Sequence, residues 1–521
     1  MSDGPLRLLY QGLERAAQRT PDKVVAVVEG QSHTYRELQE QSSRLAAALV
    51  ERGVCPGDRV AVYMDNTWPC LVSIYGALQA GAAFMVINPQ TKGAKLAYVL
   101  SDSEARVLLS DAHLEMVFGD VLDNCPSVTH LIYSGEPLTG ALAAERLEAV
   151  LEATLPLETP VPRIPNDLCA LIYTSGSTGN PKGVMHTHQS MVFALGSLTE
   201  YLCLSESDRI LNVLPLAFDY GLYQVLMAVW LGATIVLERS FTYPAMILNR
   251  MRETGVTVFP GVPTIYSMLI ASHRRQPLSF PEVTRVTNTA AALSPSLIPA
   301  LQEIFPNALI YKMYGLTECK RVSYLEPELL DSHSASVGKA IPGTEVFLLS
   351  PEGEAVPPGT EGILHVRGPH LMAGYWKQPE LSADMLKPGK LPGERVLCTH
   401  DWFKMDDEGF LYFLGRRDDI IKTRGEKVSP LEVENALLSI DGVVEAVVFG
   451  VPDDLLGQAI IACVAVSDSD LQGRKLKKQC MARLENFMVP QEVVVMEALP
   501  KSANGKIDKK AILQEMGRAG A

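Results

Sequence analysis

Short β-rich runs alternate with amphipathic helical segments through most of the chain, and this alternation constrains the fold more than any other feature. The first strand-like runs lie at 24–28, 59–64 and 106–110, and helical patterns at 35–52 and 68–79 lie between them. This spacing predicts βαβ units and a largely parallel sheet. Further strand-like runs lie at 210–214, 234–237, 256–259 and 308–311. We therefore expect an α/β fold with a large N-terminal body of stacked α/β layers.

The pattern changes near Gly338, where short strands separated by Pro and Gly turns begin. Runs at 346–349, 362–367 and 409–414 predict a small antiparallel β subdomain. The body and this subdomain together form the first expected domain, residues 1–415.

A charged turn, Gly-Arg-Arg-Asp-Asp at 415–419, separates this domain from the remainder. After it, the pattern predicts a smaller α+β domain, residues 416–521. Its expected elements are helices at 430–439 and 475–485 and strands at 443–449 and 460–466, followed by a last strand.

Composition narrows the classes of protein that fit. The 521 residues exceed one ordinary domain of ~100 to 200 residues. Hydrophobic residues make up 47% of the chain and charged residues 20%, an ordinary globular balance. The net charge of −14, without a cluster of Lys and Arg, argues against a nucleic-acid-binding face.

Cysteine spacing and the lengths of apolar runs indicate the cellular compartment of the protein. The nine cysteines form no C-x-x-C pair and no zinc-type spacing, which indicates a reducing environment. The chain opens without a signal-peptide pattern, and the apolar stretch at 222–237 is too short to span a bilayer. We expect a cytoplasmic protein with no membrane partner, and a buried helix and strand at 222–237.

The sharpest motif is Tyr-Thr-Ser-Gly-Ser-Thr-Gly-Asn-Pro-Lys-Gly at 173–183, directly after the apolar run 168–172. Glycines let backbone N–H groups approach phosphate oxygens, hydroxyls add donors, and Lys182 supplies charge. The motif has neither P-loop spacing nor G-x-G-x-x-G, so it indicates a different nucleotide-binding fold. The candidate ATP-binding residues are Thr174, Ser175, Gly176, Ser177, Thr178, Gly179 and Lys182.

Several ordered motifs together resemble those of the adenylate-forming superfamily, which comprises acyl-CoA synthetases, luciferases and peptide-synthetase adenylation domains. Beside the loop, they are Tyr-Gly-Leu-Thr-Glu at 314–318, Thr-His-Asp at 399–401, the turn at 415–419 with Lys422, and Pro-Lys-Ser-Ala-Asn-Gly-Lys-Ile-Asp at 500–508. The resemblance covers nearly the whole chain. It implies a large N-terminal domain, a small mobile C-terminal domain, and a two-step ligase reaction that uses ATP and Mg²⁺.

The implied reaction joins two anions, since a carboxylate attacks the α-phosphorus of ATP and expels pyrophosphate. Catalysis must therefore rest on positioning and on positive charge. The resemblance implies that the phosphate loop, including Thr174, binds the β- and γ-phosphates and that Glu318 binds Mg²⁺. It places Tyr314 against adenine, in a nucleotide-binding turn with Gly315 and Thr317.

The resemblance also implies which residues bind the ribose of ATP and which residues act as the hinge and the catalytic lysine of the small domain. Asp401 and Arg416 correspond to ribose-binding residues, although His400 stands where the family usually has Gly. Asp418 corresponds to the hinge. Lys506, after Gly505, corresponds to the catalytic lysine that bridges the carboxylate and the α-phosphate and then swings away.

The acid substrate is indicated by Phe-Asp at 218–219. Peptide-synthetase domains carry a similar pair, whose Asp binds the α-ammonium group, so the resemblance favours an amino acid, with L-proline as one candidate. The other interpretation is that Asp219 caps a helix that begins near Tyr220. Candidate pocket residues are Asp219, Tyr223, Thr289, Ala290, Ala291, Ala292 and Gly315.

The motifs give mixed signals about which thiol accepts the activated acyl group. Arg-Gly at 424–425 resembles carrier-protein ligases, whereas Ser-Pro-Leu-Glu-Val-Glu at 429–434 resembles CoA ligases. The overall pattern, including Glu-Cys-Lys-Arg at 318–321, resembles free-standing prolyl-type ligases that load the phosphopantetheine arm of a carrier protein. The alternatives are an acyl-CoA ligase for a small or aromatic acid, a luciferase-like oxygenase, and a non-catalytic binding protein, although the intact motifs argue against the last.

Overall fold

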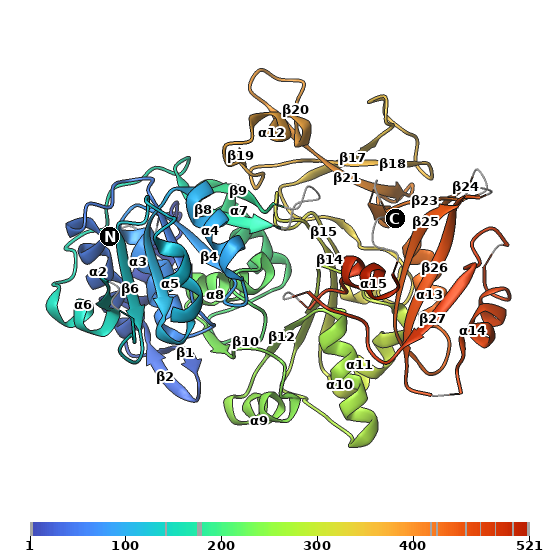
Figure 1. The fold of residues 1–521 in the computed structure, drawn as a ribbon, viewed down its shortest axis with the longest axis horizontal. Coiled ribbons are helices and arrows are strands. Elements are labelled where there is room, and N and C mark those ends of the chain that lie inside the picture. Colours follow the sequence, from blue (N-terminus) through green and yellow to red (C-terminus); the bar gives the residue numbers. More distant parts are fainter. Residues whose placement is uncertain are drawn as a thin grey trace.

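The computed structural model describes residues 4–140, 143–174, 180–416, 419–423, 426–453, 456–468, 470–484, 486–502 and 505–517. In Figure 1 the N-terminal body occupies the left and centre, the small β subdomain lies above it, and the C-terminal domain lies on the right. The expected α/β architecture is confirmed.

The first layer of the body is an eight-stranded sheet with the order β19-β9-β8-β4-β3-β5-β6-β7. Its inner parallel strands β3 and β4 are almost wholly apolar and buried, as expected for strands covered on both faces. The strands are β3 (Arg59–Tyr63), β4 (Ala83–Ile87), β5 (Ala105–Asp111), β6 (His130–Ser134), β7 (Glu145–Arg146), β8 (Leu168–Thr174), β9 (Lys182–Thr187) and β19 (Gly374–Tyr375). β8, β9 and β19 pair antiparallel at one edge.

The second layer is a nine-stranded sheet with the order β16-β15-β14-β13-β12-β10-β11-β1-β2. Its central strands β10 to β14 are parallel, and both ends turn antiparallel. The strands are β1 (Val24–Val28), β2 (Gln31–Thr34), β10 (Arg209–Asn212), β11 (Thr234–Leu237), β12 (Val258–Gly261), β13 (Arg285–Asn288), β14 (Leu309–Tyr314), β15 (Ser323–Leu325) and β16 (Lys339–Ala340).

Helices cover and join the two sheets, and one apolar core extends through both layers. The helices are α1 (Gln11–Arg19), α2 (Tyr35–Glu51), α3 (Trp68–Gln79), α4 (Gly93–Ser103), α5 (Glu115–Leu122), α6 (Leu147–Ala153), α7 (His188–Tyr201), α8 (Asp219–Leu231), α9 (Pro244–Thr254), α10 (Pro263–Arg275) and α11 (Ile298–Ile304), with 3₁₀ turns at Ala112–Leu114, Pro295–Leu297 and Pro327–Leu329.

Local signals explain two of the best-defined helices. Thr34 and Glu37 form a reciprocal capping box at the start of α2. α8 is buried on all sides from Asp219 to Val229, as its continuous apolar sequence predicts. None of the helices in the described part of the chain is both long and apolar enough to serve as a membrane span.

The small β subdomain and the C-terminal domain have their own sheets and cores. The subdomain contains β17 (Glu345–Leu349), β18 (Glu361–Arg367), α12 (Pro379–Met385), β20 (Leu386–Pro388), β21 (Arg395–Met405) and β22 (Leu411–Arg416). The C-terminal domain contains β23 (Ile421–Thr423), β24 (Glu426–Val428), α13 (Pro430–Leu438), β25 (Val443–Asp453), β26 (Gly457–Val466), α14 (Gly473–Cys480), β27 (Glu492–Met496) and α15 (Lys509–Glu515).

Sheet membership changes between Arg416 and Ile421, inside the charged turn. The expected hinge residue, Asp418, lies outside the described residues. The helix expected at 475–485 ends at Cys480, because Met481–Leu484 continue as turns after the C-cap at Met481.

Two glycines, one directly before β16 and one between β17 and β18, have similar backbone angles and different surroundings, which yields a matched stability test. Gly338 has φ +82°, and a Cβ there would lie 1.7 Å from the Tyr324 carbonyl oxygen; Gly359 has φ +78° and open space around it. We expect Gly359→Ala to cost about 1 kcal/mol of unfolding free energy from the left-handed backbone alone. Gly338→Ala adds a steric clash and should cost about 3 kcal/mol or more. Denaturant unfolding followed by tryptophan fluorescence measures both; equal losses would contradict the packing argument.

Candidate active site

The phosphate-loop motif joins two antiparallel strands. β8 ends at Thr174 and β9 begins at Lys182, and these two residues are paired across the strands. Residues 175–179, which include the candidates Ser175, Gly176, Ser177, Thr178 and Gly179, lie outside the described part. The Lys182 Nζ lies 5.0 Å from the centroid of the Tyr375 ring.

The turn at 315–321 is closely packed and is stabilised by hydrogen bonds of its backbone and of a buried lysine. A Cβ on Gly315 would lie 2.2 Å from the Lys320 carbonyl oxygen, so only glycine fits there. The backbone N–H groups of Cys319 and Lys320 both donate to the Leu316 carbonyl. The buried Lys320 side chain donates to the Ser190 hydroxyl and the His370 carbonyl, and burial lowers its pKa to about 7. This turn fixes the backbone that carries Thr317 and Glu318.

Among the described residues, the carboxylate of Glu318 is held by Tyr375. The Tyr375 hydroxyl donates to its Oε1 at 2.6 Å, and the Glu318 carbonyl accepts from the Met372 N–H at 2.7 Å. Burial, reinforced by Glu318, raises the pKa of Tyr375, so the phenol remains protonated. Glu318 is only partly buried, and a carboxylate oxygen is a ligand that Mg²⁺ prefers. The residue therefore fits the metal-binding role that the sequence suggested.

Tyr314, Asp401 and Arg416 form a second group. The Tyr314 hydroxyl donates to Asp401 Oδ2, and the Arg416 Nε lies 3.9 Å from Asp401 Oδ1. Burial raises the pKa of Asp401 to about 6, against the lowering effect of Arg416. The Tyr314 ring packs edge-on against Phe403, with 4.8 Å between ring centroids.

His400 adopts a left-handed backbone with φ +58°. A glycine accepts this conformation without strain, which explains physically why the superfamily usually has Gly there. The His400 Nε2 lies 3.1 Å from Asp384 Oδ2, and the Asp401 N–H donates to the Thr399 hydroxyl. The expected departure at position 400 therefore keeps the turn that presents Asp401.

Lys506 reaches the N-terminal body from the C-terminal domain. Gly505 has φ +74°, and the Thr264 hydroxyl donates to its carbonyl at 3.0 Å. The Lys506 Nζ lies 5.3 Å from the centroid of the Phe218 ring. Burial and Arg416 lower the pKa of Lys506, whereas Asp219 raises it. The lysine is thus within electrostatic reach of both Asp219 and Arg416.

Asp219 is a buried carboxylate at the start of α8. Its N-cap is Phe218, so Asp219 is the first helical residue rather than the cap. The Arg321 Nη1 lies 4.0 Å from Asp219 Oδ2, and both side chains are buried. Burial raises the pKa of Asp219, while Arg321 and Lys506 lower it.

Polar groups around this carboxylate lack partners among the described residues. The Tyr223 hydroxyl and the Arg321 Nε are buried and unbonded there. The Thr289 hydroxyl, in the segment directly after β13, is also buried and unbonded. Unpaired buried polar groups are costly and indicate a ligand site. Ala290 has φ +74° and is partly buried, whereas Ala291 and Ala292 are exposed.

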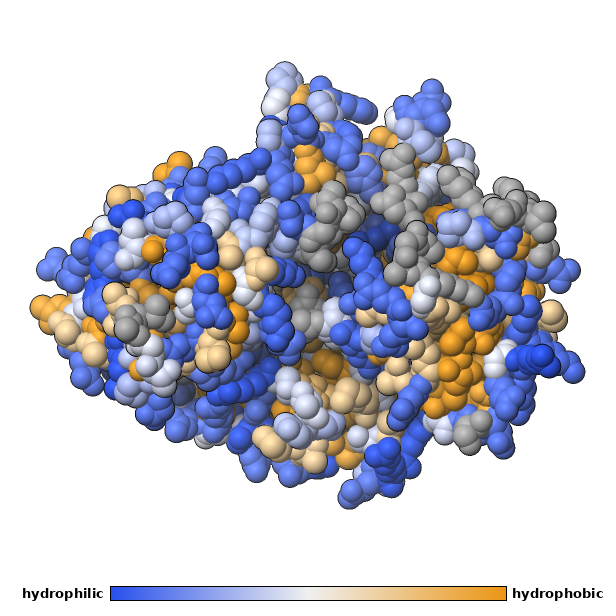
Figure 2. Space-filling model, in the orientation of Figure 1, coloured by the Kyte–Doolittle hydropathy of each residue, from blue (hydrophilic) through white to orange (hydrophobic). Residues whose placement is uncertain are grey.

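Arg416 connects these groups electrostatically. It affects the pKa values of Asp401, Tyr375 and Lys506. The surface recedes between the N-terminal body and the C-terminal domain (Figure 2), where Figure 1 shows α8 and α15 on opposite sides. The residues therefore gather at the seam between the two parts.

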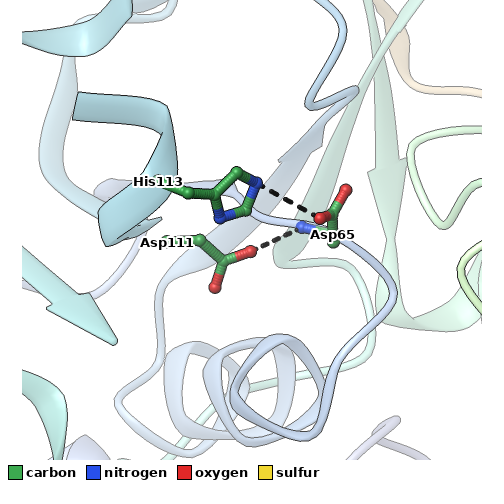
Figure 3. Close-up of side chains that lie close together, drawn as sticks. All are labelled: Asp65, Asp111 and His113. Atoms are coloured by element: carbon green, nitrogen blue, oxygen red, sulfur yellow. Dashed lines mark hydrogen bonds and ion pairs between the residues drawn. The ribbon is translucent and has the colours of Figure 1, made fainter. Parts of the chain in front are cut away.

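A separate cluster of Asp65, Asp111 and His113 is close enough to share a cation (Figure 3). The His113 Nε2 lies 3.3 Å from Asp65 Oδ2, and Arg239 already pairs with the same oxygen at 3.2 Å. Asp111 accepts the Asp65 backbone N–H at 2.8 Å. With a guanidinium in place, this cluster is a structural ion network that anchors the segment after β3.

Sequence reasoning did not assign roles to Arg321 and Tyr375. Arg321 was visible in the Glu-Cys-Lys-Arg pattern, but its pairing with Asp219 depends on the fold. Tyr375 belongs to a short Gly-Tyr-Trp run at 374–376 that carries no obvious chemical signature.

Comparison with known proteins decides the family. The model of the AMP-binding enzyme family matches residues 13–376, and that of the AMP-binding enzyme C-terminal domain matches residues 432–506. The chain belongs to the AMP-binding enzyme family. It is an adenylate-forming ligase that uses ATP to activate a carboxylic acid as its acyl-AMP.

Similar sequences include parts of large synthases. Tyrocidine synthase 3 of Brevibacillus parabrevis is 30% identical over 97% of this chain, and bacitracin synthase 3 of Bacillus licheniformis is 31% identical over 97%. The chain spans only 8% of the length of each.

Similar solved structures are nearly coextensive with the chain. An anthranilate CoA ligase in complex with anthranoyl-AMP has a TM-score of 0.90 at 25% identity and covers 100% of this chain and 99% of its own. A benzoate CoA ligase of Burkholderia xenovorans has a TM-score of 0.86 at 27% identity, covering 97% of this chain and 100% of its own.

Proposed function

We propose that this ligase activates an α-amino acid, of which L-proline is one candidate, and transfers it to the phosphopantetheine thiol of a carrier protein. The observation that carries the substrate proposal is that the Lys506 Nζ lies 5.3 Å from the ring centroid of Phe218, the residue before Asp219, and that Lys506 and Asp219 act on each other's pKa. An α-amino acid bears a carboxylate and an ammonium group one carbon apart. A partly buried cation and a buried anion in the same region match these two groups.

The residues divide the adenylation step between them. Lys506 bridges the substrate carboxylate and the α-phosphate, where negative charge develops as pyrophosphate leaves. Asp401 and Arg416 hold the ribose, Tyr314 faces adenine, and the phosphate loop with Lys182 binds the outgoing phosphates. Mg²⁺ bound to Glu318 would supply charge neutralisation at those phosphates.

The thioester step requires Lys506 to leave so that the thiol can enter. We propose residues 1–415 and 416–521 as the two moving parts, with Asp418 as the hinge. The separate sheets on either side of the charged turn support this division. The similarity to synthase segments supports a carrier protein as the acceptor.

A second candidate function is acyl-CoA ligation of a small or aromatic acid. Arg321 already neutralises Asp219, so an acid without an amino group would leave that pair intact. The similarity to anthranilate and benzoate CoA ligases supports this alternative. Incubation of the enzyme with ATP and labelled acid, together with either free CoA or a phosphopantetheinylated carrier protein, distinguishes the acceptors by where the thioester forms.

The role of Lys506 predicts that Lys506→Ala lowers adenylation by ~10³-fold, because the charge acts mainly in the transition state. ATP–pyrophosphate exchange measures this step. Lys510→Ala, which removes an exposed cation from α15, is the matched control and should exchange normally. Undiminished exchange in the Lys506 variant would refute the assignment.

The ammonium-binding role of Asp219 predicts a loss of selectivity in Asp219→Asn. We compare L-proline, or the best amino acid in a panel, with its deamino analogue. The preference for the amino acid should fall ~100-fold, because the analogue no longer leaves the buried Asp219 charge unpaired once Asn replaces it. The double variant Asp219→Asn with Arg321→Met separates the roles: it should regain stability without regaining selectivity. Full selectivity in either variant would leave Asp219 as a mere counter-ion of Arg321.

The raised pKa of Asp401 predicts a pH effect on ATP binding. Below about pH 6 the carboxylate becomes protonated and accepts hydrogen bonds less strongly. We expect the KM for ATP, divided by that of Asp401→Asn at the same pH, to rise ~10-fold between about pH 7.5 and about pH 5. The division cancels ionisation of ATP itself; a flat ratio would exclude Asp401 from nucleotide binding.

A further inference from the structure

Tyr375 contacts two parts of the nucleotide site that come from different strands. One face of its ring lies under the Lys182 ammonium group, 5.0 Å from centroid to Nζ. Its hydroxyl donates to Glu318 Oε1 at 2.6 Å. Lys182 follows the phosphate loop on β9, whereas Glu318 lies in the turn after β14. A single side chain therefore joins the edges of the two stacked sheets.

The backbone around Tyr375 leaves its ring little freedom. β19 pairs with β9, so that Tyr375 lies opposite Val184. The Trp376 N–H donates to the Gly183 carbonyl at 2.8 Å, and the Tyr375 N–H donates to the Ser382 hydroxyl at 2.8 Å. The side chain is only 2% exposed. These bonds connect the backbone that carries the ring to β9 on one side and to α12 on the other.

The same segment holds Glu318 by its backbone as well. The Met372 N–H donates to the Glu318 carbonyl at 2.7 Å. Since Oε1 accepts the hydrogen bond of the phenol, the carboxylate is oriented with Oε2, which has no hydrogen bond from the described residues, as the oxygen available to another ligand. A phenol that only donates here does not compete for a cation, in contrast to a second carboxylate.

We propose that Tyr375 is a positioning residue that sets the distance and orientation between the Lys182 ammonium group and the Glu318 carboxylate. The inference rests on the proposed roles of these two residues toward phosphate and Mg²⁺. The ring holds the lysine through a cation–π contact, and the hydroxyl holds the carboxylate through a hydrogen bond. Loss of the cation–π contact should therefore affect phosphate binding, and loss of the hydrogen bond should affect metal binding.

Two variants separate the two contacts. Tyr375→Phe keeps the ring and removes the hydroxyl, so the affinity for Mn²⁺ in the presence of a non-hydrolysable ATP analogue should fall ~10-fold. Analogue binding measured without metal should stay unchanged. Tyr375→Leu removes the ring as well, and should weaken metal-free analogue binding ~5-fold through the loss of the cation–π contact. Electron paramagnetic resonance of free Mn²⁺ and calorimetry of the analogue provide the two measurements.

Tyr35→Phe is the matched control, because its fully buried hydroxyl donates to the Ala233 carbonyl at 2.7 Å in a remote part of the body. It should leave both affinities at the wild-type value. Unchanged Mn²⁺ affinity in Tyr375→Phe, or an equal loss in Tyr35→Phe, would overturn the proposal, as would unchanged Mn²⁺ affinity in Glu318→Gln. Failure to find an amino acid substrate would refute the proposed function without altering these metal and nucleotide affinities.

Discussion

The candidate active site depends on charged side chains that the fold removes from water at one seam. Asp219 and Arg321 lie 4.0 Å apart, and both are buried. Burial of such a pair costs several kcal/mol per ion before any attraction is gained, so the pair is a poor device for stability alone. The pair instead supplies fixed charges suited to a charged ligand, and burial keeps water from screening these charges. Lys506 adds a second cation, supplied by a different domain.

Strand order explains how these charges meet. β10, β12, β13 and β14 are parallel neighbours, so their carboxyl ends lie along one edge of the nine-stranded sheet. The segments after these strands carry Asp219, Thr264, Ala290 and Glu318 respectively. Ligands of open α/β sheets bind at the carboxyl ends of strands. Four residues far apart in the sequence therefore reach one region without any unusual local structure.

Sequence reasoning worked where one short segment carries the whole signal. The apolar run 234–237 and the helix at 68–79 have the predicted bounds, because periodicity and Pro or Gly boundaries are local. It failed where a partner is distant. The bond from Tyr375 to Glu318 joins positions 57 residues apart. The contact of Arg321 with Asp219 requires β10 and β14, which β12 and β13 separate, to be assembled in one sheet first. The helix at 475–485 was too long because charged residues beyond Cys480 suit a helix and a turn equally.

Contacts across the seam also bear on the proposed movement of Lys506. The C-terminal domain has its own apolar clusters, and in the described part of the chain neither contains a residue before Ile421. Among the described residues of the loop that carries Lys506, Gly505 accepts a hydrogen bond from Thr264, and Lys506 lies against the ring of Phe218. Polar contacts of this kind are individually worth ~1 kcal/mol, far less than an extended apolar interface. The C-terminal domain also meets the subdomain where α13 packs on β22 and the Ser429 hydroxyl donates to the Leu414 carbonyl. Weak contacts at the Lys506 loop are compatible with the proposed withdrawal of the lysine, which would disturb neither core.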